Sequence, residues 1–134
     1  MLFRSAIPIL YFCPSDSALQ GKSLVATQHI DILPSVLDYL DYDQKFFAFG
    51  KSVFSDPYES MAVSYSNETY QLIQDNNVFI LRNNEKNSFF NFAKDSLLRN
   101  DLFSSDTVKE RMMEKKLKSF IQNYNHALIH NEMK

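Results

Sequence analysis

Cysteine and glycine are both scarce in this chain of 134 residues. Its one cysteine excludes an internal disulfide, which fits a reducing compartment and equally an exported bacterial domain that never needed a disulfide. Only two glycines occur, and the sequence contains neither G-x-G-x-x-G nor G-x-x-x-x-G-K. The glycine-rich loops that hold nucleotide phosphates are therefore excluded.

Strong charge and long apolar runs are missing as well. The net charge is −2, and basic residues gather beside aromatic ones only near the end of the chain, so no nucleic acid is expected as a partner. No segment approaches the roughly 18 continuous apolar residues of a membrane helix, so no membrane segment is expected. The start of the chain resembles a signal peptide, but Pro8 inside its short apolar run and the lack of a small-residue cleavage site favour a strand.

The chain nevertheless has enough apolar residues, 45%, to bury a core. Its length suits a single domain or fragment, residues 1–134. Within it we expect residues 1–55 to form the end of an α/β core, and residues 56–134 to form an antiparallel meander with a long closing helix. The predicted fold class is α/β, or α+β if the chain stands alone.

Three segments are predicted in the first half. Residues 6–12 form a continuous apolar run, typical of a buried strand, with Pro8 near its start. Residues 24–30 fit a short strand or the approach to a helix. Residues 31–42 then predict a helix, with Asp31 as its N-cap and a proline in its first turn. The apolar stripe of this helix consists of Leu33, Val36, Leu37 and Leu40.

In the second half the apolar period changes to two. Short β-like runs separated by Asn-, Asp- and Glu-containing turns indicate an antiparallel meander, and the runs are residues 61–67, 69–75, 77–83 and 88–94. Asp106 or Thr107 then caps a predicted helix over residues 108–133, supported by the i,i+4 pair of Glu114 and Lys118. The apolar positions of this helix are Met113, Leu117, Phe120, Ile121, Tyr124 and Leu128.

Several stretches carry a family resemblance. The predicted strand reads Ile7-Pro8-Ile9-Leu10, is followed by Pro14 and Gly21, and leads to Ile30-Asp31-Ile32-Leu33-Pro34-Ser35-Val36-Leu37. The stretches FAFGKSVF, SYSNETYQLIQDNNVFIL and LKSFIQNYNHALI follow in order. In these features the chain resembles the C-terminal part of sulfatase-like enzymes of the alkaline phosphatase superfamily, especially the lipoteichoic-acid-synthase-type phosphoglycerol transferases.

The resemblance implies an enzyme whose active site lies outside this chain. In that family the nucleophile (Thr, Ser or a modified Cys), the carboxylate ligands and the Asp-His-Gly segment precede the strand. Only six residues precede Ile7, and none is Asp or His, so the resemblance implies a C-terminal piece that begins just after the last metal ligand. The divalent metal (Mn, Ca, Zn or Mg) belongs to the intact enzyme, which is usually membrane-anchored with an extracytoplasmic catalytic domain. No catalytic, cofactor-binding or metal-binding residue is expected in this chain.

The stretch YFCPSD, residues 11–16, looks like part of the sulfatase motif Cys-x-Pro-Ser-Arg. Here, however, Pro14 follows Cys13 directly, and Asp16 stands where a basic residue would help. A reactive thiol needs a cation or a helix N-terminus to lower its pKa. We therefore expect Cys13 to be a small, buried, apolar residue at the end of a strand, and not a nucleophile.

The three histidines are the remaining candidates for chemistry. His126 and His130, one helical turn apart and close to Glu132, could chelate a metal, but they also fit a solvated helix end. His29 and Asp31 could form an acid–base pair; alternatively Asp31 caps the helix and His29 packs or faces solvent. We expect His126 and His130 to lie at a solvated helix end. We expect Asp31 to cap the helix and His29 to pack or face solvent.

Two other features have a functional and a structural interpretation. Residues 67–69 form an N-x-T glycosylation sequon, which we attribute to chance because the resemblance is to bacterial proteins. The tyrosines and phenylalanines of residues 39–54 could form a platform for a sugar or a lipid, but we expect them to lie in the core.

These features support two hypotheses about function. In the first, the chain is the C-terminal fragment of a sulfatase-like hydrolase or phosphoglycerol transferase, inactive alone, and its partner is the missing N-terminal catalytic part. In the second, it is a free-standing, non-catalytic interaction domain that forms a homo-oligomer through its exposed strand, because an unpaired apolar strand is an association site.

Overall fold

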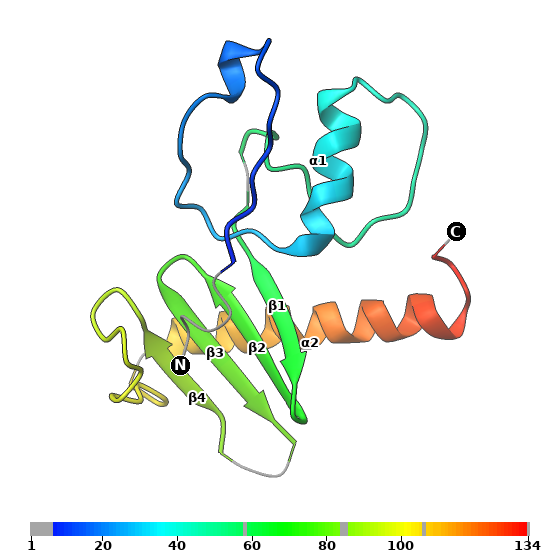
Figure 1. Cartoon of the computed structure of the whole chain (residues 1–134). Helices are drawn as coiled ribbons and strands as arrows, with labels where there is room; N and C mark the ends of the chain where they lie inside the picture. The colour runs from blue at the N-terminus through cyan, green and yellow to red at the C-terminus, as the bar shows by residue number, and fades with distance from the viewer. Residues whose placement is uncertain (1–6, 58, 84–85, 106, 134) are drawn as a thin grey trace.

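The computed structural model describes residues 7–57, 59–83, 86–105 and 107–133 (Figure 1). A four-stranded sheet lies against a long helix, and the first half of the chain lies beyond one end of the sheet. The elements, in chain order, are the 3₁₀ turns η2 (Ser17–Leu19) and η3 (His29–Asp31), helix α1 (Ile32–Tyr39), strands β1 (Ala62–Ser66), β2 (Thr69–Gln74), β3 (Asn77–Arg82) and β4 (Ser88–Asn91), and helix α2 (Thr107–Ile129).

The four strands form one antiparallel sheet in the order β1-β2-β3-β4. Asn67 and Glu68 make a two-residue turn between β1 and β2 with φ angles of 49° and 58°, and Asp75 starts the next turn with a φ of 51°. Two-residue turns with positive φ match the twist of antiparallel strands, and Asn and Asp tolerate them better than most residues. The meander predicted between residues 61 and 94 is confirmed, and the sequon occupies its first turn.

One face of the sheet packs against α2. Leu72, Phe79 and Phe89 lie opposite one another on three adjacent strands and are buried against Met113 and Leu117. Partly buried neighbours surround this cluster: Met61, Val63, Tyr70, Leu81, Leu102, Phe103 and Ile121. Full burial of one such side chain contributes about 1.5–3 kcal/mol, so this cluster holds the helix and the sheet together.

The opposite face of the sheet carries a smaller apolar cluster. Val78, Ile80 and Phe90 are buried there. Phe92 and Leu98, from the irregular segment after β4, pack against them. That segment therefore covers the β3–β4 side of this face.

Helix α2 lies close to its predicted position. Asp106, one of the two predicted caps, lies outside the described residues, and the helix begins at Thr107. It ends at Ile129, four residues before the predicted end at residue 133. The predicted ion pair is confirmed, with 2.6 Å between Lys118 Nζ and Glu114 Oε1.

Only the first part of α2 is covered by the sheet. Met113 and Leu117 are buried, whereas Tyr124 and Leu128 are exposed, because the helix continues past the edge of the sheet (Figure 1). The predicted apolar stripe is therefore a core surface along its first half only. Among the described residues, none of the helices combines the length and the apolar character needed to cross a bilayer.

Residues 7–12 do not form the predicted buried strand. They have no regular secondary structure, and the side chains of Leu10 and Phe12 are 84% and 81% exposed. A strand needs neighbours that satisfy its backbone N–H and C=O groups, and no described strand pairs with this segment. Ala6, the first residue of the predicted strand, lies outside the described residues. Residues 24–30 follow the second of their two alternatives and lead into α1 through η3.

Helix α1 is shorter than predicted, and its apolar stripe is not buried. Leu33, Val36 and Leu40 are exposed, whereas Pro34 and Ser35 are buried. The side of α1 that carries Pro34 and Ser35 is buried because it is hydrogen-bonded to a loop that folds back from further along the chain. The structure is thus a mixed α/β fold with an antiparallel sheet, and its first half leaves the predicted core side chains in solvent.

Candidate functional site

Asp31 is the buried carboxylate of the first half, with 2% of its surface exposed. Its Oδ1 accepts a hydrogen bond from the backbone N–H of Lys51 and its Oδ2 accepts one from the backbone N–H of Gln28, both at 3.0 Å. Asp31 stands at the N-cap position of α1, as predicted, but its carboxylate makes no hydrogen bond to the first turn of that helix. A buried carboxylate is tolerated when it is hydrogen-bonded, and here the bonds attach η3 to a loop 20 residues away.

Ser35 completes this attachment. Its hydroxyl donates to the carbonyl oxygen of Asp31 at 2.5 Å and accepts from the backbone N–H of Val53 at 3.0 Å. Gly50 fits against the same turn because it has no side chain: a Cβ there would lie 1.9 Å from the carbonyl oxygen of Ile30. We call the group formed by Gln28, Asp31, Ser35, Lys51 and Val53 the polar junction.

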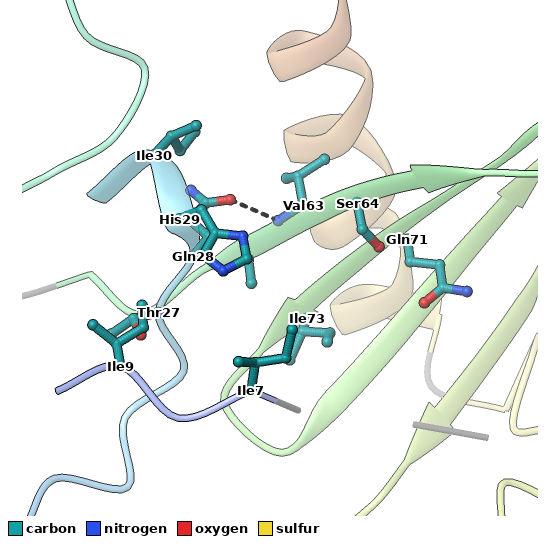
Figure 2. A pocket seen from close by; sticks show the side chains of 11 residues that line it. Ile7, Ile9, Thr27, Gln28, His29, Ile30, Val63, Ser64, Gln71 and Ile73 are labelled. Carbon is teal, nitrogen blue, oxygen red and sulfur yellow. Dashed lines mark hydrogen bonds between the residues drawn. The ribbon is translucent and has the colours of Figure 1, made fainter. Parts of the chain in front are cut away.

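A hollow of about 350 Å³ lies between residues 7–9, η3 and the sheet (Figure 2). His29 lines it from η3, Ile7 and Ile9 line it from the first segment, and the sheet contributes Ser64, Gln71 and Ile73. Its size lies near the lower limit of small-molecule pockets, which span roughly 300–1,000 Å³.

The edge of the hollow is fixed by hydrogen bonds to the sheet. Gln28 Oε1 accepts a bond of 2.9 Å from the backbone N–H of Val63 in β1, drawn as a dashed line in Figure 2. Among the described residues, the lining has one imidazole, that of His29, and no carboxylate. Asp31 does not line the hollow, and its two oxygens accept backbone hydrogen bonds, which is the structural role expected of it beside His29.

Cys13 lies in a loop and is half-buried, so the expectation of a buried residue at a strand end is wrong. Its Sγ lies 3.4 Å from the hydroxyl of Ser15 and 3.5 Å from that of Tyr39, which donates to Asp16 Oδ2 at 2.8 Å. The hydrogen bond with Ser15, and then that with Tyr39, lower the pKa of Cys13, and the bonds to Cys13 and Asp16 raise the pKa of Tyr39. None of these groups supplies the positive charge that usually holds a thiolate, so it stays our prediction that Cys13 is not a nucleophile.

The first half exposes many large apolar side chains. We call those of residues 7–12 and the outer side of α1 the front apolar residues: Ile7, Leu10, Phe12, Leu33, Val36 and Leu40. Single exposed apolar residues are common on protein surfaces, whereas contiguous apolar patches are typical of interaction sites.

The aromatic residues between positions 39 and 54 are not the core that was predicted. Exposed members of this group are Tyr39, Tyr42, Phe46, Phe47 and Phe54. Phe49 is half-buried and packs on α2, with its ring centre 5.7 Å from that of Phe120 and 5.3 Å from that of Tyr124. Phe49 therefore joins the two halves of the chain.

Glu59 makes a second link between the two halves. Its carboxylate pairs with Lys51 at 2.6 Å and with Lys116 of α2. The hydrogen bond from Lys116, followed by that from Lys51, lowers the pKa of Glu59 from 4.5 to about 2. No sequence pattern pointed to this pair of contacts, because the three residues are far apart in the chain.

His126 and His130 lie at the end of α2 as predicted. Their ring centres are 4.1 Å apart and their planes differ by 24°, and His126 Nδ1 lies 3.5 Å from Glu132 Oε2. In the part of the chain that the structure describes, no three or more His, Cys, Asp or Glu side chains are grouped so that they could hold a metal ion.

Comparison with known proteins did not identify a family: no protein-family model matches the chain, and no curated protein matches it either.

Proposed function

We propose that this chain is the C-terminal portion of a sulfatase-like, metal-dependent hydrolase or phosphoglycerol transferase, and that its first half docks onto the catalytic α/β core of that enzyme. The proposal is carried by one observation. Residues 7–12 and the outer side of α1 have the sequence of a buried strand and a buried helix face, yet the front apolar residues are exposed and only Ile9, Tyr11 and Leu37 are half-buried.

Burial of these side chains would be strongly favourable. Leu10 and Phe12 alone, at 84% and 81% exposure, would each contribute on the order of 1.5–3 kcal/mol if a partner surface covered them. A segment with unpaired backbone groups and apolar side chains can also add to the edge of a neighbouring sheet. The alkaline-phosphatase-like fold that the sequence resembles would supply such a sheet.

The polar junction supports the proposal because it holds the first half in a defined arrangement. The bonds of Asp31 and Ser35 to residues 51 and 53 fix α1 relative to the following loop. Gln28 fastens η3 to β1. A surface held in place in this way binds a partner with less loss of conformational entropy than a disordered segment.

The chemistry of the intact enzyme would come from outside this chain. By resemblance, a divalent metal polarises a sulfate or phosphate ester, and a Thr, Ser or modified Cys forms a covalent intermediate. Cys13 is not proposed as that nucleophile. The role of this chain is to complete the sheet and to close the enzyme with its meander and α2, in an enzyme of extracytoplasmic, membrane-anchored type.

The first experiment is an activity assay of the purified chain. We expect no hydrolysis of p-nitrophenyl sulfate, p-nitrophenyl phosphate or bis-p-nitrophenyl phosphate with added Mn²⁺, Ca²⁺ or Zn²⁺. Metal-dependent turnover that disappears in Cys13→Ala or His29→Ala would contradict the proposal. The coding sequence upstream of the Met1 codon provides the positive test, because it should encode a Thr or Ser nucleophile and an Asp-His-Gly segment in frame.

A second experiment separates this function from a homodimeric interaction domain, which the same exposed residues favour. Sedimentation velocity of the isolated chain should show weak, open-ended association that decreases when Leu10 and Phe12 are both changed to Asp. Val108→Asp is the control, because Val108 is a comparably exposed apolar residue, 71%, on α2. A discrete, tight dimer that the double change abolishes would favour the interaction domain instead.

A further inference from the structure

The end of α2 has a defined geometry that brings three polar side chains together. Asn131 takes a φ of 53°, and its backbone N–H donates to the carbonyl oxygen of Leu128. The backbone N–H of Glu132 donates to the carbonyl oxygen of Ala127 at 3.0 Å. This pair of bonds with a left-handed residue is a Schellman motif, which ends the helix and turns the chain back. As a result Glu132 lies beside His126, six residues earlier.

The two imidazoles in this motif are oriented by their Nδ1 atoms. His130 Nδ1 lies 2.8 Å from the carbonyl oxygen of His126. A carbonyl oxygen can only accept, so Nδ1 of His130 carries the proton and the lone pair of the neutral ring is on Nε2. His126 Nδ1 faces the carboxylate of Glu132 at 3.5 Å, which favours the same tautomer. Bonding of one ring nitrogen to a carbonyl or carboxylate, with the other nitrogen available, is typical of histidines that bind metals.

We infer that His126 and His130 form a two-histidine site for a borderline divalent cation such as Zn²⁺, Ni²⁺ or Cu²⁺, with Glu132 orienting His126 and water completing the coordination. Tetrahedral Zn²⁺ with Zn–N bonds of about 2.0–2.1 Å needs two nitrogens roughly 3.4 Å apart. The rings are stacked, with centres 4.1 Å apart and planes 24° apart, so both must turn for their Nε2 atoms to point at one ion. Both side chains are exposed, which leaves them room to turn.

The surroundings favour a cation of this class. The last carbonyl groups of a helix carry partial negative charge, and Glu132 adds a full one. Imidazole nitrogen is a preferred ligand of Zn²⁺, Ni²⁺ and Cu²⁺, whereas Mg²⁺ and Ca²⁺ prefer oxygen. The site is separate from the metal site of the proposed enzyme, whose ligands lie outside this chain, and it is independent of that function.

The test is a titration of the full chain with ZnCl₂. Binding is monitored by isothermal titration calorimetry and by the NMR resonances of the imidazole nitrogens. We expect one ion per chain, with shifts of the Nε2 resonances of His126 and His130. His126→Ala and His130→Ala should each weaken Zn²⁺ binding at least tenfold, and Glu132→Gln should weaken it by roughly tenfold, as loss of an orienting partner does. MgCl₂ should produce no such shift.

His29→Ala is the matched control, because His29 is also exposed but has no second histidine on its turn. This variant should bind Zn²⁺ as the wild type does. Since His126 and His130 are exposed, circular dichroism should show that their alanine variants remain folded. Unchanged affinity in either of these two variants, or equal shifts at all three histidines, would show only separate adventitious binding and would overturn the inference.

Discussion

Asp31 is the residue on which the arrangement of the first half depends most. It stands at the predicted N-cap of α1, but its carboxylate binds backbone N–H groups before and after that helix and none in its first turn. The sequence could not indicate this, because one of its partners, Lys51, becomes a neighbour only when the following loop folds back. The position of Asp31 before a helix is equally compatible with both roles.

The importance of this carboxylate can be tested by Asp31→Asn. The amide replaces one acceptor oxygen with a donor that faces a backbone N–H, so we expect a loss of about 1–3 kcal/mol in the free energy of unfolding. Urea denaturation provides the measurement. Asp41→Asn is the control, because Asp41 is exposed with a φ of 52°, which Asn accepts, and it should change stability by less than about 0.5 kcal/mol.

The lowered pKa of Glu59 predicts how the stability of the fold depends on pH. Its pKa in the folded chain is lowered from 4.5 to about 2, so it stabilises the fold above pH 4.5, and this contribution is lost as the pH falls towards 2. Because about half of the Glu59 side chain, 49%, is exposed, the effect at neutral pH is at most about 1 kcal/mol. The stability difference between the wild type and Glu59→Gln should therefore shrink as the pH falls from 4.5 to 2. A difference that does not change with pH would show that the ion pairs contribute nothing.

At the level of elements, the second half of the chain was predictable and the first half was not. The strands between residues 61 and 94 and helix α2 show periods of two and of three to four, and they cover one another's apolar faces. Local pattern and final burial therefore agree. Residues 7–12 and α1 show equally clear patterns, but their burial depends on surfaces that the described residues do not provide.

The packing of α2 on the sheet buries the larger apolar cluster and gives a prediction of its own. Leu117 is fully buried among Leu72, Phe79 and Phe89, so Leu117→Ala should lower the free energy of unfolding by about 2–5 kcal/mol. Val108→Ala, on an exposed turn of the same helix, should cost less than about 1 kcal/mol. Thermal unfolding followed by circular dichroism would compare them. Similar losses in both variants would mean that α2 does not pack on the sheet in this way.

The candidate sites were predicted in part. The histidines at the end of α2 were visible as a pair one turn apart, but their tautomers depend on the Schellman motif that follows them. The surroundings of Cys13 could not be predicted, because Tyr39 lies 26 residues away in the chain. The hollow beside His29 likewise depends on Gln28 binding Val63 of β1, 35 residues later.

At the scale of the whole molecule, the chain has one part with a closed core of its own and one part whose burial depends on a partner. The sheet and α2 have a closed core, whereas the first half is attached to them through the polar junction, Glu59 and Phe49. The front apolar residues face solvent. Such a molecule is expected to be most stable in its second half, of intermediate stability at the polar junction, and readily opened at residues 7–12 until a partner covers them.

Hydrogen exchange of the isolated chain tests this division most directly. We expect slow exchange, set by global unfolding, for the amides of β3 and of α2 at residues 113–121. The amides of Lys51 and Val53 should show intermediate protection. In the dilute, monomeric chain, the amides of residues 9–12 should exchange almost as fast as in an unfolded peptide. Protection of residues 9–12 equal to that of β3 in the dilute, monomeric chain would show that the first half needs no partner, and would contradict the account.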